Sequence, residues 1–182
     1  MSQNPKLITL ESVKKAAEIV KEVAIKTPLQ QNLNLSSKFN ANILLKREDL
    51  QQVRSYKIRG AYHKISSLSA KETENGIVCA SAGNHAQGVA FACSKLKIKG
   101  TIVMPTPTPK QKIEQVKMFG GDFVEVLLTG DTFDDASNSA KKLCLEQHKT
   151  FVHPFDDIKI IEGQATVGLE IIEQTKEPID YV

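Results

Sequence analysis

From residue 43 onward, short runs of β-branched and other apolar residues alternate with longer stretches that have helical spacing. The short runs lie at 43–45, 77–80, 101–104, 123–127 and 151–152, and the helical stretches lie at 57–67, 85–97, 110–119, 132–148 and 163–175. Strands that alternate with helices of these lengths are typical of βαβ units. The sequence therefore predicts an α/β fold with open, mostly parallel sheets and flanking helices.

The two ends of the chain carry further patterns. Apolar residues at i, i+3, i+4 and i+7 spacing over 13–24 predict an amphipathic helix that ends by Thr27-Pro28. At the other end, residues 178–182 predict the start of a further strand. A parallel strand is normally covered on both faces. We therefore expect the chain to be incomplete at its C-terminus.

Charge and hydropathy exclude several classes of protein. Lys and Arg number 24 against 21 Asp and Glu, which leaves a net charge of +3 with the two signs interspersed. A nucleic-acid binder normally carries a basic stripe, so no nucleic-acid partner is predicted. No apolar run approaches the ~20 residues that span a bilayer, and the first residues lack the apolar stretch of a signal peptide. We expect no membrane partner and a cytoplasmic location.

Cysteine, histidine and carboxylate residues show no pattern of a metal or disulfide site. The chain has three cysteines, odd in number and far apart: Cys79, Cys93 and Cys144. We interpret them as reduced thiols in apolar surroundings. The four histidines lack metal-ligand spacing, and no metal is predicted. The neighbouring Glu48 and Asp49 are interpreted as a solvated turn, and residues 155–157 as a turn with a helix cap.

One candidate ligand loop follows the predicted strand at 77–80, because open parallel sheets bind ligands beyond the carboxyl ends of their strands. It reads Ser81-Ala82-Gly83-Asn84-His85-Ala86-Gln87-Gly88. Its small residues would let backbone N–H groups at a helix start point outward, which favours a carboxylate or a phosphate. Gly88 would let the helix lie close to the sheet. The alternative is an ordinary turn in which Asn84 caps the helix and His85 is solvated.

A second candidate is the run Ser55-Tyr56-Lys57-Ile58-Arg59-Gly60-Ala61, with Ser55 as the predicted N-cap of a helix. Lys57 would lie in the first turn, where the helix dipole and burial both lower the pKa of a lysine from about 10.4. A partly neutral lysine is a nucleophile suited to Schiff-base chemistry. The alternative is an ordinary exposed lysine.

These two runs resemble the lysine motif and the carboxylate loop of threonine dehydratases and related fold-type II pyridoxal-phosphate enzymes. Further matches follow in the same order as in that family: Lys46-Arg47-Glu48-Asp49-Leu50, Val103-Met104-Pro105, Thr108-Pro109-Lys110, Phe119-Gly120-Gly121, Pro154-Phe155-Asp156-Asp157 and the run from Gly163 to Glu170. The resemblance covers nearly all of the 182 residues.

The resemblance implies a role for each matched residue. Lys57 would be the catalytic residue and would hold pyridoxal 5'-phosphate as a Schiff base. Asn84 would donate a hydrogen bond to the phenolic oxygen of the cofactor, and Tyr56 would lie beside its ring. The substrate carboxylate would be surrounded, largely through backbone N–H groups, by Ser81, Ala82, Gly83, Asn84 and His85.

The resemblance also implies a two-domain architecture. Residues 50–155 would form the small open-sheet domain, while 1–49 and 156–182 would belong to a large domain that is incomplete here. The glycine-rich loop that holds the cofactor phosphate in the family has no match, since Gly120-Gly121 and Gly130 belong to other loops. The chain alone is therefore expected to be inactive.

The activity implied for the whole protein is conversion of L-threonine to 2-oxobutanoate and ammonia, the first step toward isoleucine. Its partners would be a small-molecule amino-acid substrate and further copies of itself in a homo-oligomer. One alternative is a serine racemase or serine dehydratase, because Lys57 and Asn84 fit those reactions equally. The other alternative is a non-catalytic fragment.

Overall fold

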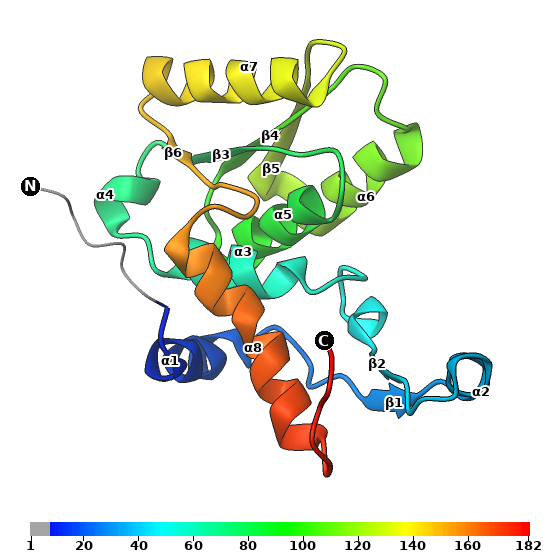
Figure 1. The fold of residues 1–182 in the computed structure, drawn as a ribbon. Helices are drawn as coiled ribbons and strands as arrows, with labels where there is room; N and C mark the ends of the chain where they lie inside the picture. The colour runs from blue at the N-terminus through cyan, green and yellow to red at the C-terminus, as the bar shows by residue number, and fades with distance from the viewer. Residues whose placement is uncertain (1–7) are drawn as a thin grey trace, which may run out of the picture.

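A computed structural model describes residues 8–182 (Figure 1). Its main sheet has four parallel strands in the order β5-β4-β3-β6. Their bounds are Ile77–Ala80 for β3, Gly100–Met104 for β4, Val124–Leu128 for β5 and Thr150–Phe151 for β6. Every residue of β3 and β4 is buried, as expected for central strands of a sheet covered on both faces. The predicted α/β fold is confirmed, and these four strands lie within one residue of their predicted bounds.

Helices cover both faces of this sheet (Figure 1). On one face lie α5 (Asn84–Leu96) and α6 (Lys110–Gly120), and on the other lies α7 (Phe133–Glu146). Successive residues of β3 belong to different core clusters: Ile77 packs in the larger one, and Val78 packs with Ala136 and Ala140 of α7 in the smaller one. This alternation follows from the two-residue period of a strand.

Beside the sheet, α3 (Lys57–Ser66) packs against both α5 and α8 (Ile158–Gln174), and α1 (Leu10–Val20) packs against α8. The helix α8 begins five residues before its predicted start at 163, because Asp157 Oδ1 accepts hydrogen bonds from two amides of its first turn. The cap predicted at 155–157 is thus confirmed. The predicted N-terminal helix ends earlier than expected, at Val20.

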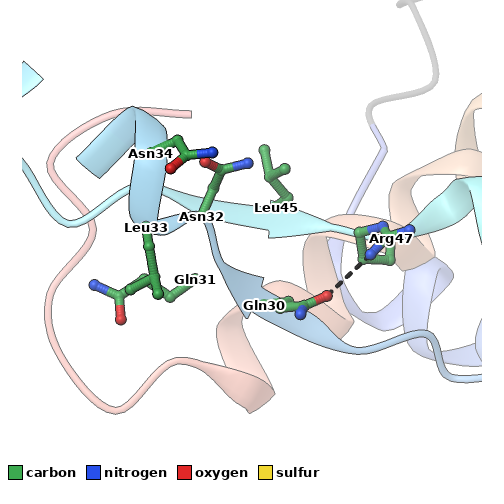
Figure 2. Close-up of a pocket in the computed structure, with 7 residues that line it drawn as sticks. All are labelled: Gln30, Gln31, Asn32, Leu33, Asn34, Leu45 and Arg47. Atoms are coloured by element: carbon green, nitrogen blue, oxygen red, sulfur yellow. Dashed lines mark hydrogen bonds between the residues drawn. The ribbon is translucent and has the colours of Figure 1, made fainter. Parts of the chain in front are cut away.

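A separate antiparallel pair is formed by β1 (Leu29–Gln31) and β2 (Leu44–Lys46), with α2 (Leu33–Phe39) between them. The strand predicted at 43–45 exists, but its expected place in the parallel series is wrong. A hollow of about 320 Å³ lies against this pair (Figure 2), where Arg47 Nη1 donates to Gln30 Oε1 over 2.9 Å. The remaining short elements are η1 (Glu48–Leu50), α4 (Ala70–Thr73) and η2 (Gly121–Phe123).

The prediction of a strand at 178–182 is wrong, because these residues have irregular structure. A strand needs a neighbour to pair its backbone N–H and C=O groups, and within residues 8–182 no strand pairs with this segment. Of the helices in this part of the chain, none combines the length and the apolar character that a bilayer span requires.

At Gly88, α5 lies close against α3 and not against the sheet as predicted. A Cβ atom at Gly88 would lie 2.9 Å from the carbonyl oxygen of Lys57 and 3.2 Å from the amide nitrogen of Ile58. These are backbone atoms, which can move only together with the helix. The small residue therefore sets the spacing between α5 and the first turn of α3.

We expect Gly88→Ala to lower the free energy of unfolding by about 1–3 kcal/mol, the usual cost of overpacking. Gly168→Ala is the matched control, because Gly168 is exposed within α8 and an added Cβ would meet no atom within 4 Å. That change should be neutral or should stabilise the protein by about 0.5–1 kcal/mol. Urea denaturation of both variants measures the difference, and equal stability of the two would contradict the close approach.

Candidate active site

The two runs singled out in the sequence meet just beyond the carboxyl end of β6. Lys57 is the first residue of α3, and its Nζ donates a hydrogen bond to the Pro154 carbonyl oxygen over 2.8 Å. His85 is the second residue of α5, and its Nε2 lies 3.2 Å from the Val152 carbonyl oxygen. The segment 152–154 therefore holds side chains from the starts of both helices.

Lys57 has the electrostatic environment that the sequence predicted. Its side chain is half-buried, and this burial lowers the pKa of the amine below its ordinary value of 10.5. The ring of Tyr56 lies beside it, with its centroid 5.3 Å from Nζ, and remains 41% exposed. A lysine with a lowered pKa has a larger fraction of free amine at neutral pH, which makes it a better nucleophile.

The prediction that Ser55 caps α3 is wrong. The N-cap residue is Tyr56, which already has helical backbone angles and provides no side-chain hydrogen bond. The helix starts at Lys57, as the helical pattern predicted, and Ser55 Oγ is buried with no hydrogen-bond partner within residues 8–182. The first amides of α3 thus lack a side-chain acceptor, so the positive end of the helix dipole beside Lys57 stays uncompensated.

The loop from β3 to α5 has the open geometry expected of an anion site. The Gly83 amide donates to Ser81 Oγ over 3.2 Å, and Gly83 is the N-cap of α5 with no side-chain cap of its own. A Cβ atom at Gly83 would meet nothing within 4 Å, so there is free space in front of the loop. Asn84 is exposed at the helix start. Amides in the first turn of a helix favour a bound anion.

The interpretation of His85 as a solvated residue is wrong. Its side chain is 3% exposed, and its Nδ1 has no hydrogen-bond partner within residues 8–182. Burial lowers its pKa from 6.5 to about 4, with smaller contributions from the charges of Lys57 and His153, whereas the contact with the Val152 carbonyl raises it. The imidazole is therefore neutral at physiological pH.

Of the glycines that the sequence assigned to other loops, Gly120 and Gly121 lie at the opposite edge of the sheet from these residues, whereas Gly130 follows the carboxyl end of β5, on the same edge. Gly120 and Gly121 come directly before β5, at the amino end of that strand, whereas Ser81 and Pro154 follow the carboxyl ends of β3 and β6. In a parallel sheet the carboxyl ends of all strands lie at one edge and the amino ends lie at the opposite edge. In the part of the chain that the structure describes, no cluster of three or more His, Cys, Asp or Glu side chains could hold a metal ion.

A buried charge cluster that the sequence did not predict lies next to Lys57. Glu48, interpreted as part of a solvated turn, is 8% exposed and pairs with Arg59 through hydrogen bonds of 2.8 and 2.9 Å. Arg59 also pairs with Glu170, which lies 111 residues further along the chain. The only local signal was an arginine two residues after Lys57, which by itself does not indicate burial.

Comparisons with known proteins give a consistent result. The profile of a family described as "Pyridoxal-phosphate dependent enzyme" matches residues 20–182. A biosynthetic L-threonine dehydratase, IlvA, of Halalkalibacterium halodurans is 55% identical over 175 residues, which is 96% of this chain and 42% of that protein. The corresponding Bacillus subtilis protein is 56% identical over 166 residues, 91% of this chain and 39% of its own length. The chain thus spans less than half of these relatives.

Solved structures match over nearly the whole chain. The processed form of threonine deaminase isoform 2 from Solanum lycopersicum has a TM-score of 0.82 at 43% identity, with 95% of this chain and 48% of that chain covered. Maize serine racemase has a TM-score of 0.86 at 29% identity, with 92% of this chain and 50% of that chain covered.

Proposed function

Because this chain belongs to the family of pyridoxal-phosphate dependent enzymes, we propose that the whole protein converts L-threonine to 2-oxobutanoate and ammonia. The observation that carries the proposal is Lys57: an amine with a lowered pKa at the uncapped start of α3, held over the segment that also positions His85. The identity of 55% with a biosynthetic L-threonine dehydratase supports threonine as the substrate.

The residues at this place fit the cofactor of the family. Lys57 offers an amine for a Schiff base, and the free space at Gly83 leaves room for a group in front of α5. Ser55 Oγ and His85 Nδ1 are buried polar atoms that have no hydrogen-bond partner among residues 8–182. We propose that Lys57, Asn84 and Tyr56 hold the cofactor. The substrate carboxylate would lie against the loop formed by Ser81, Ala82, Gly83, Asn84 and His85.

Each of these residues has a part in the proposed reaction. Pyridoxal phosphate, when bound, supplies a conjugated ring that accepts the electron pair left by the Cα proton. Lys57 Nζ would take that proton, and its neutral fraction is raised by burial. Once protonated, Nζ has an acceptor in the Pro154 carbonyl oxygen, 2.8 Å away. The amides at the start of α5 would orient the substrate by its carboxylate, so that the Cα–H bond faces Lys57.

A second candidate function is serine racemisation, favoured by the TM-score of 0.86 with maize serine racemase. The discriminating experiment is to express the complete reading frame and to supply L-threonine, L-serine and D-serine in parallel. Formation of 2-oxobutanoate at the highest kcat/KM supports the proposed function. Interconversion of the serine enantiomers at a higher kcat/KM would replace it by the second candidate.

The proposal extends to location and organisation. Buried free thiols at Cys79 and Cys93 support a cytoplasmic protein, because the cytosol keeps cysteines reduced. We also propose that the whole protein assembles into a homo-oligomer, as the family resemblance implies. We propose the division 1–49, 50–155 and 156–182 for the domains. Its support is that all four parallel strands lie within the central range.

We expect Asn84→Ala in the whole protein to lower kcat/KM for threonine about 10- to 100-fold, because one charge-assisted hydrogen bond contributes about 1.5–3 kcal/mol. The absorption maximum of the bound cofactor should shift as well. Asn84 is exposed, so the melting temperature should stay unchanged. The matched control is Asn75→Ala, an exposed asparagine before the amino end of β3. An unchanged spectrum and rate would make Asn84 a turn residue only.

A further inference from the structure

Arg59, two residues after Lys57, is the largest of the fully buried side chains among residues 8–182. Its Nε donates to Glu48, its Nη1 to Glu170 and Thr166, and its Nη2 to both carboxylates. The distances of these bonds run from 2.7 to 3.1 Å. A guanidinium group has five N–H donors, and each of them has an acceptor here.

The two carboxylates come from separate segments of the chain. Glu48 belongs to η1, and Glu170 belongs to the last turns of α8. Lys46 of β2 donates to Glu170 over 2.5 Å, so two buried cations face two carboxylates and the cluster is neutral overall. Burial alone would raise the pKa of Glu48, but hydrogen bonds from Arg59, Thr27 and Gln51 together lower it, which keeps this carboxylate charged.

A cluster of this kind fixes geometry more than it adds stability. Desolvation of buried ions largely cancels their mutual attraction, and apolar residues of the same volume often give a protein of equal stability. A bidentate guanidinium–carboxylate pair, however, allows few orientations, because both groups are planar and each bond is directional. Arg59 makes two such pairs, which restrict rotation of the first turn of α3 about the helix axis.

The distances of α3 from α5 and from α8 are fixed independently, by glycines. A Cβ atom at Gly163 of α8 would lie 2.7 Å from the Arg59 carbonyl oxygen, and one at Gly60 would lie 2.8 Å from the Ile160 carbonyl oxygen. On the opposite side, Gly88 of α5 lies against the Lys57 carbonyl oxygen. Contacts with α5 and α8 thus set the distance of α3 from its neighbours, while Arg59 sets its rotation.

We propose that Arg59 is the positioning residue for Lys57: its paired carboxylates fix the rotation of α3 so that Lys57 Nζ is directed at the Pro154 carbonyl and the start of α5. Arg59 acts through the helix and touches neither the substrate nor the cofactor. The inference rests on the role of Lys57 in the proposed function. Lysine cannot replace Arg59, because a compact ammonium cannot bridge two carboxylates bidentately.

The test is the pH dependence of Lys57 acetylation by acetic anhydride in the cofactor-free whole protein, followed by peptide mass spectrometry. Lys110 of α6, whose side chain is exposed and which does not lie on α3, serves as the internal reference for reagent dose. In Arg59→Lys and in Glu170→Gln, we expect the midpoint for Lys57 to rise toward 10.5, the ordinary value for lysine. A rise of one pH unit means about tenfold less free amine at any pH below the midpoint. When pyridoxal phosphate is added back, the threonine turnover that these variants recover should be lower in parallel.

Two controls separate positioning from mere stability. Val103→Ala removes a buried side chain from the core cluster on the α7 face and should lower the melting temperature without moving the Lys57 midpoint. If Arg59→Lys and Glu170→Gln fold, lose stability and keep the parent midpoint, Arg59 is only structural and the proposal is overturned. Peptide mapping of the borohydride-reduced holoenzyme checks the proposed function separately, because a cofactor label on another lysine would refute that function whatever the midpoints show.

Discussion

Replacing Lys57 by alanine is expected to abolish threonine turnover in the whole protein, by about 10⁴-fold or more. Loss of a general base alone costs about 10²–10⁴-fold, and Lys57 would also be the tether of the cofactor. The same change should remove the pyridoxyl group that borohydride fixes to the protein. Peptide mapping of the reduced protein measures this directly, and the label should be found on the peptide that contains Lys57.

The matched control is Lys64→Ala, which removes another partly buried lysine of α3. Lys64 pairs with Asp157 over 2.8 Å and lies two turns beyond Lys57 on the same helix. This variant should keep both the label and the turnover, even if it melts at a lower temperature. Retention of the label in Lys57→Ala, or its loss in Lys64→Ala, would show that the cofactor lysine has been misassigned.

The parallel sheet could be predicted because its signals are local. Ile77 to Ala80 form an unbroken apolar run, and a central strand covered on both faces requires just such a run. The start of α5 after Gly83 and the lowered pKa of Lys57 could also be predicted, because small residues after a strand and a lysine in a first helical turn have consequences that depend on neighbours in sequence.

The features that were missed depend on contacts between distant residues. Glu48 looks like a turn residue until Arg59 and Glu170 bury it, and no local pattern links positions that are 111 residues apart. The segment 178–182 has strand-like residues, yet within residues 8–182 it has no strand to pair with. His85 is a further case, because its Nε2 contacts the carbonyl oxygen of Val152, which lies 67 residues further along the chain, and no local pattern predicts that contact.

The stability of the protein should fall as the pH drops from 6.5 toward 4, because His85 is buried as the neutral imidazole. In the folded protein its pKa is lowered to about 4, whereas in the unfolded chain it is near 6.5. Between these values the unfolded state binds one proton more, so stability falls with decreasing pH by about 1.4 kcal/mol per pH unit. The full difference is about 3 kcal/mol, and below pH 4 this contribution no longer changes.

Urea denaturation at pH 7 and pH 5 isolates this effect, since most carboxylates titrate below pH 5. The parent should lose about 2 kcal/mol over that interval. The matched variant is His85→Gln, which can still donate to the Val152 carbonyl but carries no titrating ring. It should be less stable than the parent at pH 7 and nearly independent of pH down to 5, because the glutamine amide stays neutral. An equal loss in both proteins would mean that His85 is not the buried group that the unfolded state protonates.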